Sequence, residues 1–291
     1  MSKEIGDFMN LRKPAAAGTF YPGSRNEIIS MLDNLFSSPS VKRLKSAGPE
    51  MIGFVSPHAG YIYSGKTAAH GYQRISDIGK DATFIILGPN HYGVGPEVSI
   101  YPSGEWETPL GNVSIDKDFI DKICSVCNGD IMMDASAHLY EHSIEVQIPF
   151  LQYLFGNKFK IVPICMLNQS ISVSNAVANF LYDVYLDFEK KGKKVFFIAS
   201  SDFSHYVQKK KAEKDDKDAI EKIKSLDVRS FYEIIGKKQI SICGYGPIST
   251  LMFLSKKLGS SQINLLDYST SADATGDEEQ VVGYASIEFL K

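Results

Sequence analysis

Three of the six histidines stand where an apolar, strand-like run gives way to a polar turn. They are His58 in FVSPH, His91 in IILGPNH and His205 in FFIASSDFSH. Imidazole is the commonest metal ligand in proteins, and its ordinary pKa of about 6.5 also suits proton transfer. Each histidine alone is as consistent with a turn residue that hydrogen-bonds the backbone. Their coincidence favours one shared site, because loops after neighbouring strands converge at one edge of an α/β sheet.

The residues around these histidines indicate a confined pocket. Glycines flank both His58 and His91, which is typical of turns where the backbone passes close to another group. Tyr63 and Tyr92 follow the first two histidines and are candidates for the pocket wall, with ordinary packing as the alternative.

Carboxylates accompany two of the histidine motifs. Asp202 precedes His205 by three residues, so it either orients or charge-stabilises the imidazole, or it caps a helix. His142 and Glu145 are also three apart and can share one helix face. His138, Glu141 and His142 have only a weak metal-ligand spacing, which favours helix capping and support of other ligands.

Cysteine usage predicts thiols rather than disulfides. Four cysteines in 291 residues are too few for a disulfide scaffold. Cys165 continues a strand and should be buried and inert, whereas Cys243 stands beside glycines in CGYGP and can supply a thiolate.

These residues require a scaffold, and short Val-, Ile- and Phe-rich runs that alternate with helical periodicity predict an α/β fold, a sheet with helices on its faces. We expect strands at 51–56, 82–87, 159–165, 194–199, 263–266 and 281–289. We expect helices at 26–36, 65–75, 116–126, 142–155, 173–190, 210–225, 230–236 and 247–258. The mixed charges of KKKAEKDDKD, from Lys209 to Asp218, predict a solvated helix face.

Composition narrows the functional class. The chain has 31 Lys and Arg against 34 Asp and Glu, a net charge of −3, which argues against a nucleic-acid partner. Hydrophobic residues at 44% and charged residues at 22% fit a globular chain. From the length we expect one large domain over 1–291, with two domains as the alternative and residues 1–10 disordered or loosely packed. No run approaches the ~20 apolar residues that span a bilayer, and the acidic start MSKEIGDFMN is unlike a signal peptide, so we expect a cytoplasmic protein without membrane contact.

Several motifs in order resemble the Memo family, also called AmmeMemoRadiSam system protein B. They are RKPAAAGTFYPG, VSPHAGYIYSG, LGPNHYG, TPLGNV, EHSIEVQIPFL, SSDFSHY, CGYGP and VVGYASI, and they run nearly from end to end. That family is similar in fold to the class III extradiol dioxygenases, which use non-haem iron. The resemblance therefore implies a single α/β domain with a mixed central β-sheet flanked by helices and a dioxygenase-like pocket. It also implies functional partners in the AmmeMemoRadiSam system.

Carried over by motif, the resemblance implies metal ligation by His58, His91 and Cys243. It puts His205 where the dioxygenases keep a catalytic histidine, and Asp202 and Tyr63 at other pocket positions; His205 and Asp202 are the expected catalytic residues. Phe20 stands where the animal member of the family has tryptophan. The peptide binding proposed for the pocket of that member therefore does not transfer directly to this chain. Phe20, Tyr63, Tyr92, His142 and Glu145 make up the expected pocket wall.

A cysteine in place of a carboxylate ligand changes the expected metal chemistry. Oxygenases hold Fe(II) with two histidines and one carboxylate, whereas thiolate is softer and favours Cu(I) or zinc while iron stays available. We therefore expect a redox-active copper or iron site, with zinc as a further candidate. The alternatives are an extradiol-type dioxygenase and a non-catalytic module for a small molecule, peptide or phospholigand. Arg12 and Arg25 are the only arginines near the motifs, which weakens the phospholigand alternative.

Overall fold

The computed structural model describes residues 11–291, in which strands and helices alternate over much of the chain. The strands are β1 (Leu11–Arg12), β2 (Met51–Ser56), β3 (Thr83–Pro89), β4 (Val98–Ile100), β5 (Glu105–Thr108), β6 (Gly111–Ile115), β7 (Met132–Met133), β8 (Lys160–Met166), β9 (Val195–Ser200), β10 (His205–Val207), β11 (Gln262–Thr270) and β12 (Val281–Leu290). The helices are α2 (Arg25–Ser37), α3 (Pro39–Lys42), α4 (Tyr61–Arg74), α5 (Lys117–Val126), α6 (His142–Glu145), α7 (Ile148–Phe155), α8 (Ile171–Lys190), α9 (Lys209–Lys224), α10 (Val228–Lys238), α11 (Tyr245–Lys257) and α12 (Ala272–Thr275). The predicted loose N-terminus concerns residues 1–10, which lie outside the described part.

Five neighbouring strands in the order β6-β8-β3-β9-β2 run parallel and form the centre of the sheet. Every residue of β2, β3 and β9 is buried, as expected for parallel strands covered on both faces. Their apolar runs therefore show no alternation in the sequence. Because β3, β9 and β2 are adjacent and parallel, the loops after them leave the sheet at the same edge.

Antiparallel strands extend this centre. β12 pairs with β2 and β11, and the short β10 pairs with the start of β12. On the other side, β5 and β6 form a hairpin and β1 runs parallel to β5. The sheet is therefore mixed, and the predicted α/β fold class is confirmed; the architecture is consistent with a dioxygenase-like fold.

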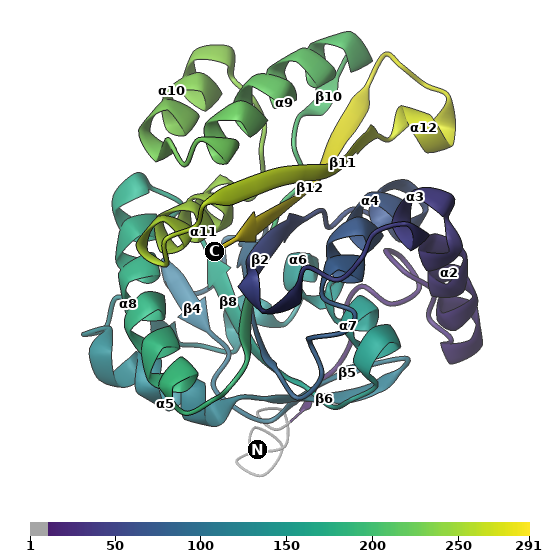
Figure 1. Cartoon of the computed structure of the whole chain (residues 1–291). Helices are drawn as coiled ribbons and strands as arrows, with labels where there is room; N and C mark the ends of the chain where they lie inside the picture. Colours follow the sequence, from purple (N-terminus) through teal and green to yellow (C-terminus); the bar gives the residue numbers. More distant parts are fainter. Residues whose placement is uncertain (1–10) are drawn as a thin grey trace.

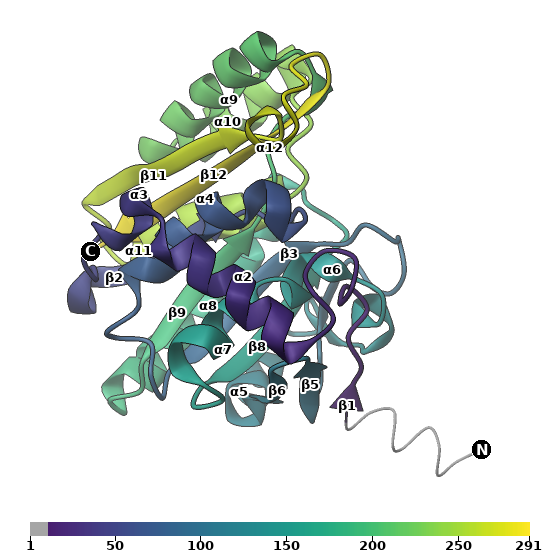
Figure 2. The same ribbon diagram turned by 90° about the vertical axis from the view of Figure 1, so that its right-hand side faces the viewer.

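Helices cover both faces of the sheet. Figure 1 shows α5 and α8 on one side of the central strands and α2, α4 and α7 on the other. Figure 2 shows α9 and α10 outside β11 and β12. None of the helices in residues 11–291 has the length and apolar character that a bilayer crossing requires.

The structure differs from the sequence prediction in several elements, including the four-residue helices α3 and α12, which were not predicted. The helix expected at 142–155 is two helices, because Pro149 is tolerated only in the first turn and α7 starts anew at Ile148. The prediction also missed the two- to five-residue strands β1, β4, β5, β6, β7 and β10. Such segments are too short for a hydrophobic period to be recognised.

Candidate functional site

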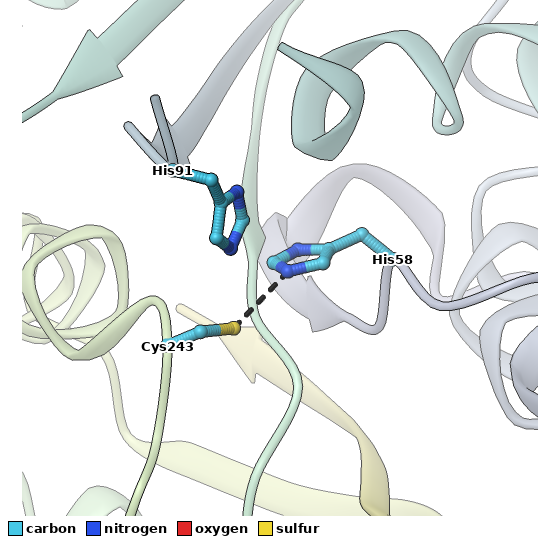
Figure 3. A group of neighbouring side chains, drawn as sticks. All are labelled: His58, His91 and Cys243. Carbon is cyan, nitrogen blue, oxygen red and sulfur yellow. Dashed lines mark hydrogen bonds between the residues drawn. The ribbon is translucent and has the colours of Figure 1, made fainter. Parts of the chain in front are cut away.

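His58, His91 and Cys243 meet at the carboxyl edge of the parallel strands. His58 lies two residues beyond β2 and His91 two residues beyond β3. One ligand atom from each of the three side chains lies within 4.8 Å of the other two. Figure 3 shows the two imidazole rings and the thiol pointing toward one another. Metal bonds of about 2.0–2.3 Å put two ligands of one ion up to ~4.4 Å apart, so small side-chain shifts suffice to share an ion.

Cys243 reaches this edge from the turn that precedes α11. The backbone amide of Asp202 donates to its sulfur at 3.1 Å, and the amide of Cys243 donates to the carbonyl of Asp202 at 3.3 Å. A Cβ on Gly244 would overlap the carbonyl oxygen of Ser200, at the end of β9. Glycine at this position therefore lets the turn lie against the strand end and brings the thiol to the histidines.

The hydrogen bonds around His58 fix which ring nitrogen carries the proton. Ser200 Oγ donates its only proton to the carbonyl of Ser143 at 2.6 Å and accepts from Gln147 Nε2 at 2.8 Å. It can therefore only accept from His58 Nδ1, which lies 2.9 Å away. His58 is protonated at Nδ1, and its Nε2 presents a lone pair to Cys243 Sγ at 3.1 Å.

His91 is oriented in the same way by a carboxylate. Its Nδ1 lies 2.8 Å from Glu141 Oε1, and its backbone amide donates to Glu141 Oε2 at 2.7 Å. Burial opposes ionisation of Glu141, but the hydrogen bonds from His91 outweigh it and lower the pKa to about 2. An ionised carboxylate only accepts, so His91 Nδ1 carries a proton and Nε2 is free to bind a metal.

Burial sets the protonation of the remaining groups. It lowers the pKa of His58 well below its ordinary value, with His91 adding to the effect. Burial, followed by the charge of Asp202, raises the pKa of the Cys243 thiol. Without metal His58 is therefore a neutral imidazole and Cys243 a protonated thiol, and a metal that binds the sulfur must displace a proton.

Asp202 contacts His58 rather than His205. Its Oδ1 accepts the backbone amide of His58 at 2.8 Å, and its Oδ2 lies 4.0 Å from His58 Nε2. No helix starts at residue 202, so Asp202 is not a helix cap, and no hydrogen bond joins Asp202 to His205 within residues 11–291. The carboxylate instead ties the turn after β9 to the turn after β2.

His205 follows at the start of β10. The Nδ1 atom lies 2.8 Å from the carbonyl oxygen of Ser241, and the backbone amide of His205 donates to Ser241 Oγ at 2.7 Å. A carbonyl only accepts, so Nδ1 is the donor and Nε2 of the neutral ring carries the lone pair. His205 thus has the tautomer of a proton acceptor.

A cavity of about 650 Å³ adjoins the cluster, and His58, His91, Asp202 and His205 are among its lining residues. Its wall also contains Phe20, Tyr63, His142, Tyr206 and Tyr284. The rings of Phe20 and His142 stack with centroids 4.2 Å apart. Burial, followed by the charge of His58, lowers the pKa of His142 to about 4, so this imidazole is neutral too.

Two residues expected in the pocket wall lie elsewhere. Tyr92 is 56% exposed and is not among the residues that line the cavity. Glu145 is fully buried in an ion pair with Arg12 at 2.6 Å and also accepts the hydroxyl of Tyr21 at 2.6 Å. Helical spacing put Glu145 and His142 on one face, but only the histidine reaches the cavity.

Three residues support the histidines beyond what was predicted from the sequence: Ser200 and Gln147 had no expected site role, and Glu141 was expected only as a cap or supporting group. All three lie within the histidine motifs, in SSDFSH and EHSIEVQ. A metal-bound imidazole usually donates its second N–H to an acceptor, so a search of these motifs for acceptors points to Ser200 and Glu141. It does not find Gln147, which donates to Ser200.

The fold and this cluster define an α/β protein with a His, His and Cys group at the carboxyl edge of its parallel strands. A family model described as Memo-like protein matches residues 12–288. A MEMO1 family protein of Ignicoccus hospitalis is 42% identical over 290 residues, covering 97% of this chain and 99% of the relative. One of Thermoplasma acidophilum is 44% identical over 278 residues, covering 95% and 97%. The chain belongs to the Memo family.

Proposed function

We propose that this protein binds one redox-capable transition metal through His58, His91 and Cys243. The observation that carries the proposal is which ring nitrogen of each histidine holds the proton. Ser200 and Glu141 engage the Nδ1 atoms, so both Nε2 lone pairs are directed to the space beside the thiol. Two imidazole nitrogens and one sulfur are donor atoms that suit such a transition metal.

Copper or iron are the metals we propose. A thiolate favours Cu(I) and zinc over hard cations, while two imidazoles keep iron accessible. When bound, the metal supplies electron transfer or Lewis-acid chemistry to a ligand in the adjoining cavity. The proposal includes a cytoplasmic location, because a reducing compartment keeps Cys243 available as a thiolate.

His205 has the proton-transfer role in this proposal. Its Nδ1–H is held by the Ser241 carbonyl, so Nε2 is the atom that accepts or returns a proton on the cavity side. Because Asp202 holds the turn after β2, it positions His58 and is not the partner of His205. The two residues expected to act as a catalytic pair therefore have separate functions.

The cavity argues against a phosphorylated ligand. Within residues 11–291 no lysine or arginine lines it, and phosphate recognition in proteins relies on such side chains. An uncharged small molecule or a neutral segment of a peptide fits this wall better. The remaining alternative, extradiol ring cleavage, is disfavoured because a thiol stands in place of the expected carboxylate.

Anaerobic titration with Cu(I), Fe(II) and Zn(II) tests the proposal. We expect one ion per wild-type chain and a large loss of affinity in His58→Ala, His91→Ala and Cys243→Ala. Cys124→Ala is the matched control, since this thiol lies in α5, outside the cluster. Unchanged stoichiometry and affinity in all three cluster variants would overturn the proposal.

A further inference from the structure

His205 and Tyr206 are consecutive residues that line the same cavity. Both belong to β10, and successive side chains of a strand point to opposite faces of the sheet. A regular strand would therefore direct only one of them into the cavity. The backbone between them must depart from strand geometry.

The departure is a bulge at Tyr206. His205 pairs with Val282 and Val207 with Val281, so Tyr206 is an extra residue opposite β12. Its φ of +56° lies in the left-handed region, which bulky side chains rarely adopt. Bulges redirect side chains beside functional sites, and strained backbone persists where the surrounding structure holds it in place.

No internal contact of the Tyr206 side chain accounts for this backbone. The residue is 73% exposed, and its hydroxyl has no hydrogen-bond partner within residues 11–291. Its ring lies beside the imidazole of His205, with centroids 5.9 Å apart. The bulge thus holds an aromatic ring at the open side of the cavity, next to the proton acceptor.

The rest of the cavity lining indicates what such a ring would contact. Apart from Asp202 and the histidines, the lining consists of uncharged residues, among them Thr275, Gln280 and the rings of Phe20 and Tyr63. A flat, uncharged part of a ligand can pack against these side chains with the smallest free-energy cost of removing polar groups from water.

We propose that Tyr206 is a specificity-determining residue whose ring packs against a flat, uncharged part of the ligand that extends outward from the metal. The inference rests on the proposed metal site. The bulge serves to keep this ring and the His205 imidazole on the same side of β10.

Two uncharged nitrogen donors test the inference on Co(II)-loaded protein at pH 8, where the cobalt spectrum reports binding. Imidazole reaches the metal alone, whereas 4-phenylimidazole adds a ring directed outward. We expect wild type to bind the phenyl probe at least tenfold more tightly than imidazole, and Tyr206→Gly and Tyr206→Asn to reduce this ratio to within about threefold. Tyr140→Asn, at a tyrosine that is 69% exposed and outside the cavity lining, should retain the wild-type ratio.

Thermal unfolding provides the second readout. Glycine adopts a φ of +56° without strain, so Tyr206→Gly should melt no lower than wild type while losing the preference for the phenyl probe. A preserved preference in Tyr206→Gly, a wild type without any preference, or a lower melting temperature of Tyr206→Gly would each overturn the inference. Failure of Co(II) or imidazole to bind at all would instead overturn the metal site and this inference with it.

Discussion

Glu141 lies 2.8 Å from His91 Nδ1 although the two residues are fifty positions apart in the chain. The same carboxylate accepts the backbone amides of His91 and Ser143. It therefore holds both the ring and the turn that carries it. The proposed site depends on this contact as much as on its ligands.

Glu141→Gln should lower metal affinity by about 10–100-fold, because a neutral amide no longer holds the His91 tautomer as firmly. Competition with a chromophoric chelator measures the change. Glu107→Gln, in the surface pair with Lys13, is the control and should bind like wild type. Wild-type affinity in Glu141→Gln would show that the carboxylate does not support a ligand.

The buried pair of Arg12 and Glu145 should be important for stability. Arg12 also donates to the carbonyls of His138 and Glu141, at 2.7 and 2.9 Å. Arg12→Met leaves Glu145 as an unpaired buried charge, so we expect a loss of about 3–5 kcal/mol in the free energy of unfolding.

Urea unfolding measures this effect of Arg12→Met. In the exposed pair of Lys13 and Glu107, Lys13→Met should cost at most about 1 kcal/mol. Equal losses in the two variants would contradict the importance of the buried pair.

Asp216 should make stability depend on pH. Burial raises its pKa to about 6, although Ser204 and Tyr268 donate hydrogen bonds to it. Since the unfolded value is about 3.9, the folded state binds the extra proton between roughly pH 4 and 6, and stability falls as pH rises through this window. Asp216→Asn should remove about 1–3 kcal/mol of that pH dependence.

The neighbouring Asp215 offers a control of opposite sign. Burial opposes its ionisation, but hydrogen bonds from Lys211 and Lys238 prevail and lower its pKa. It therefore stabilises the fold above its unfolded pKa and loses this effect as pH falls through the folded pKa. Urea unfolding from about pH 2.5 to 7 covers both windows, the one below about pH 4 for Asp215 and the one between about pH 4 and 6 for Asp216. Identical wild-type and Asp216→Asn profiles would contradict the prediction.

His205→Ala should leave metal affinity within about tenfold of wild type, because loss of a group that does not bind the metal costs roughly 1–2 kcal/mol. His91→Ala should weaken binding far more. Isothermal titration of both variants with the same metal separates the roles. If both variants lose binding completely, His205 is a ligand and the assignment of Cys243 has to be revised.

The sequence predicted the parts of the site that depend on strand order. The fully apolar runs before His58 and His91 are typical of buried parallel strands, and such strands bring their following loops to one edge. That Cys243 would share the cluster came from the family resemblance, since its turn precedes a helix far along the chain.

Contacts between distant side chains could not be predicted in this way. That Ser200 lies against His58 depends on the strand register, which pairs Ser56 with Ser200. The bulge at Tyr206 left no signal, because β10 has only three residues. The run expected to be a solvated helix face contains the fully buried Asp216, since a charge pattern does not reveal which turn of the helix faces β12.

X-ray absorption at the metal edge of protein loaded with one equivalent of Cu(I) or Fe(II) tests the central claim most directly. We expect one sulfur scatterer, from Cys243, together with imidazole nitrogens from His58 and His91. The sulfur contribution should vanish in Cys243→Ala and persist in His205→Ala. A first coordination sphere without sulfur in the wild type, or one unchanged by Cys243→Ala, would contradict the proposed site.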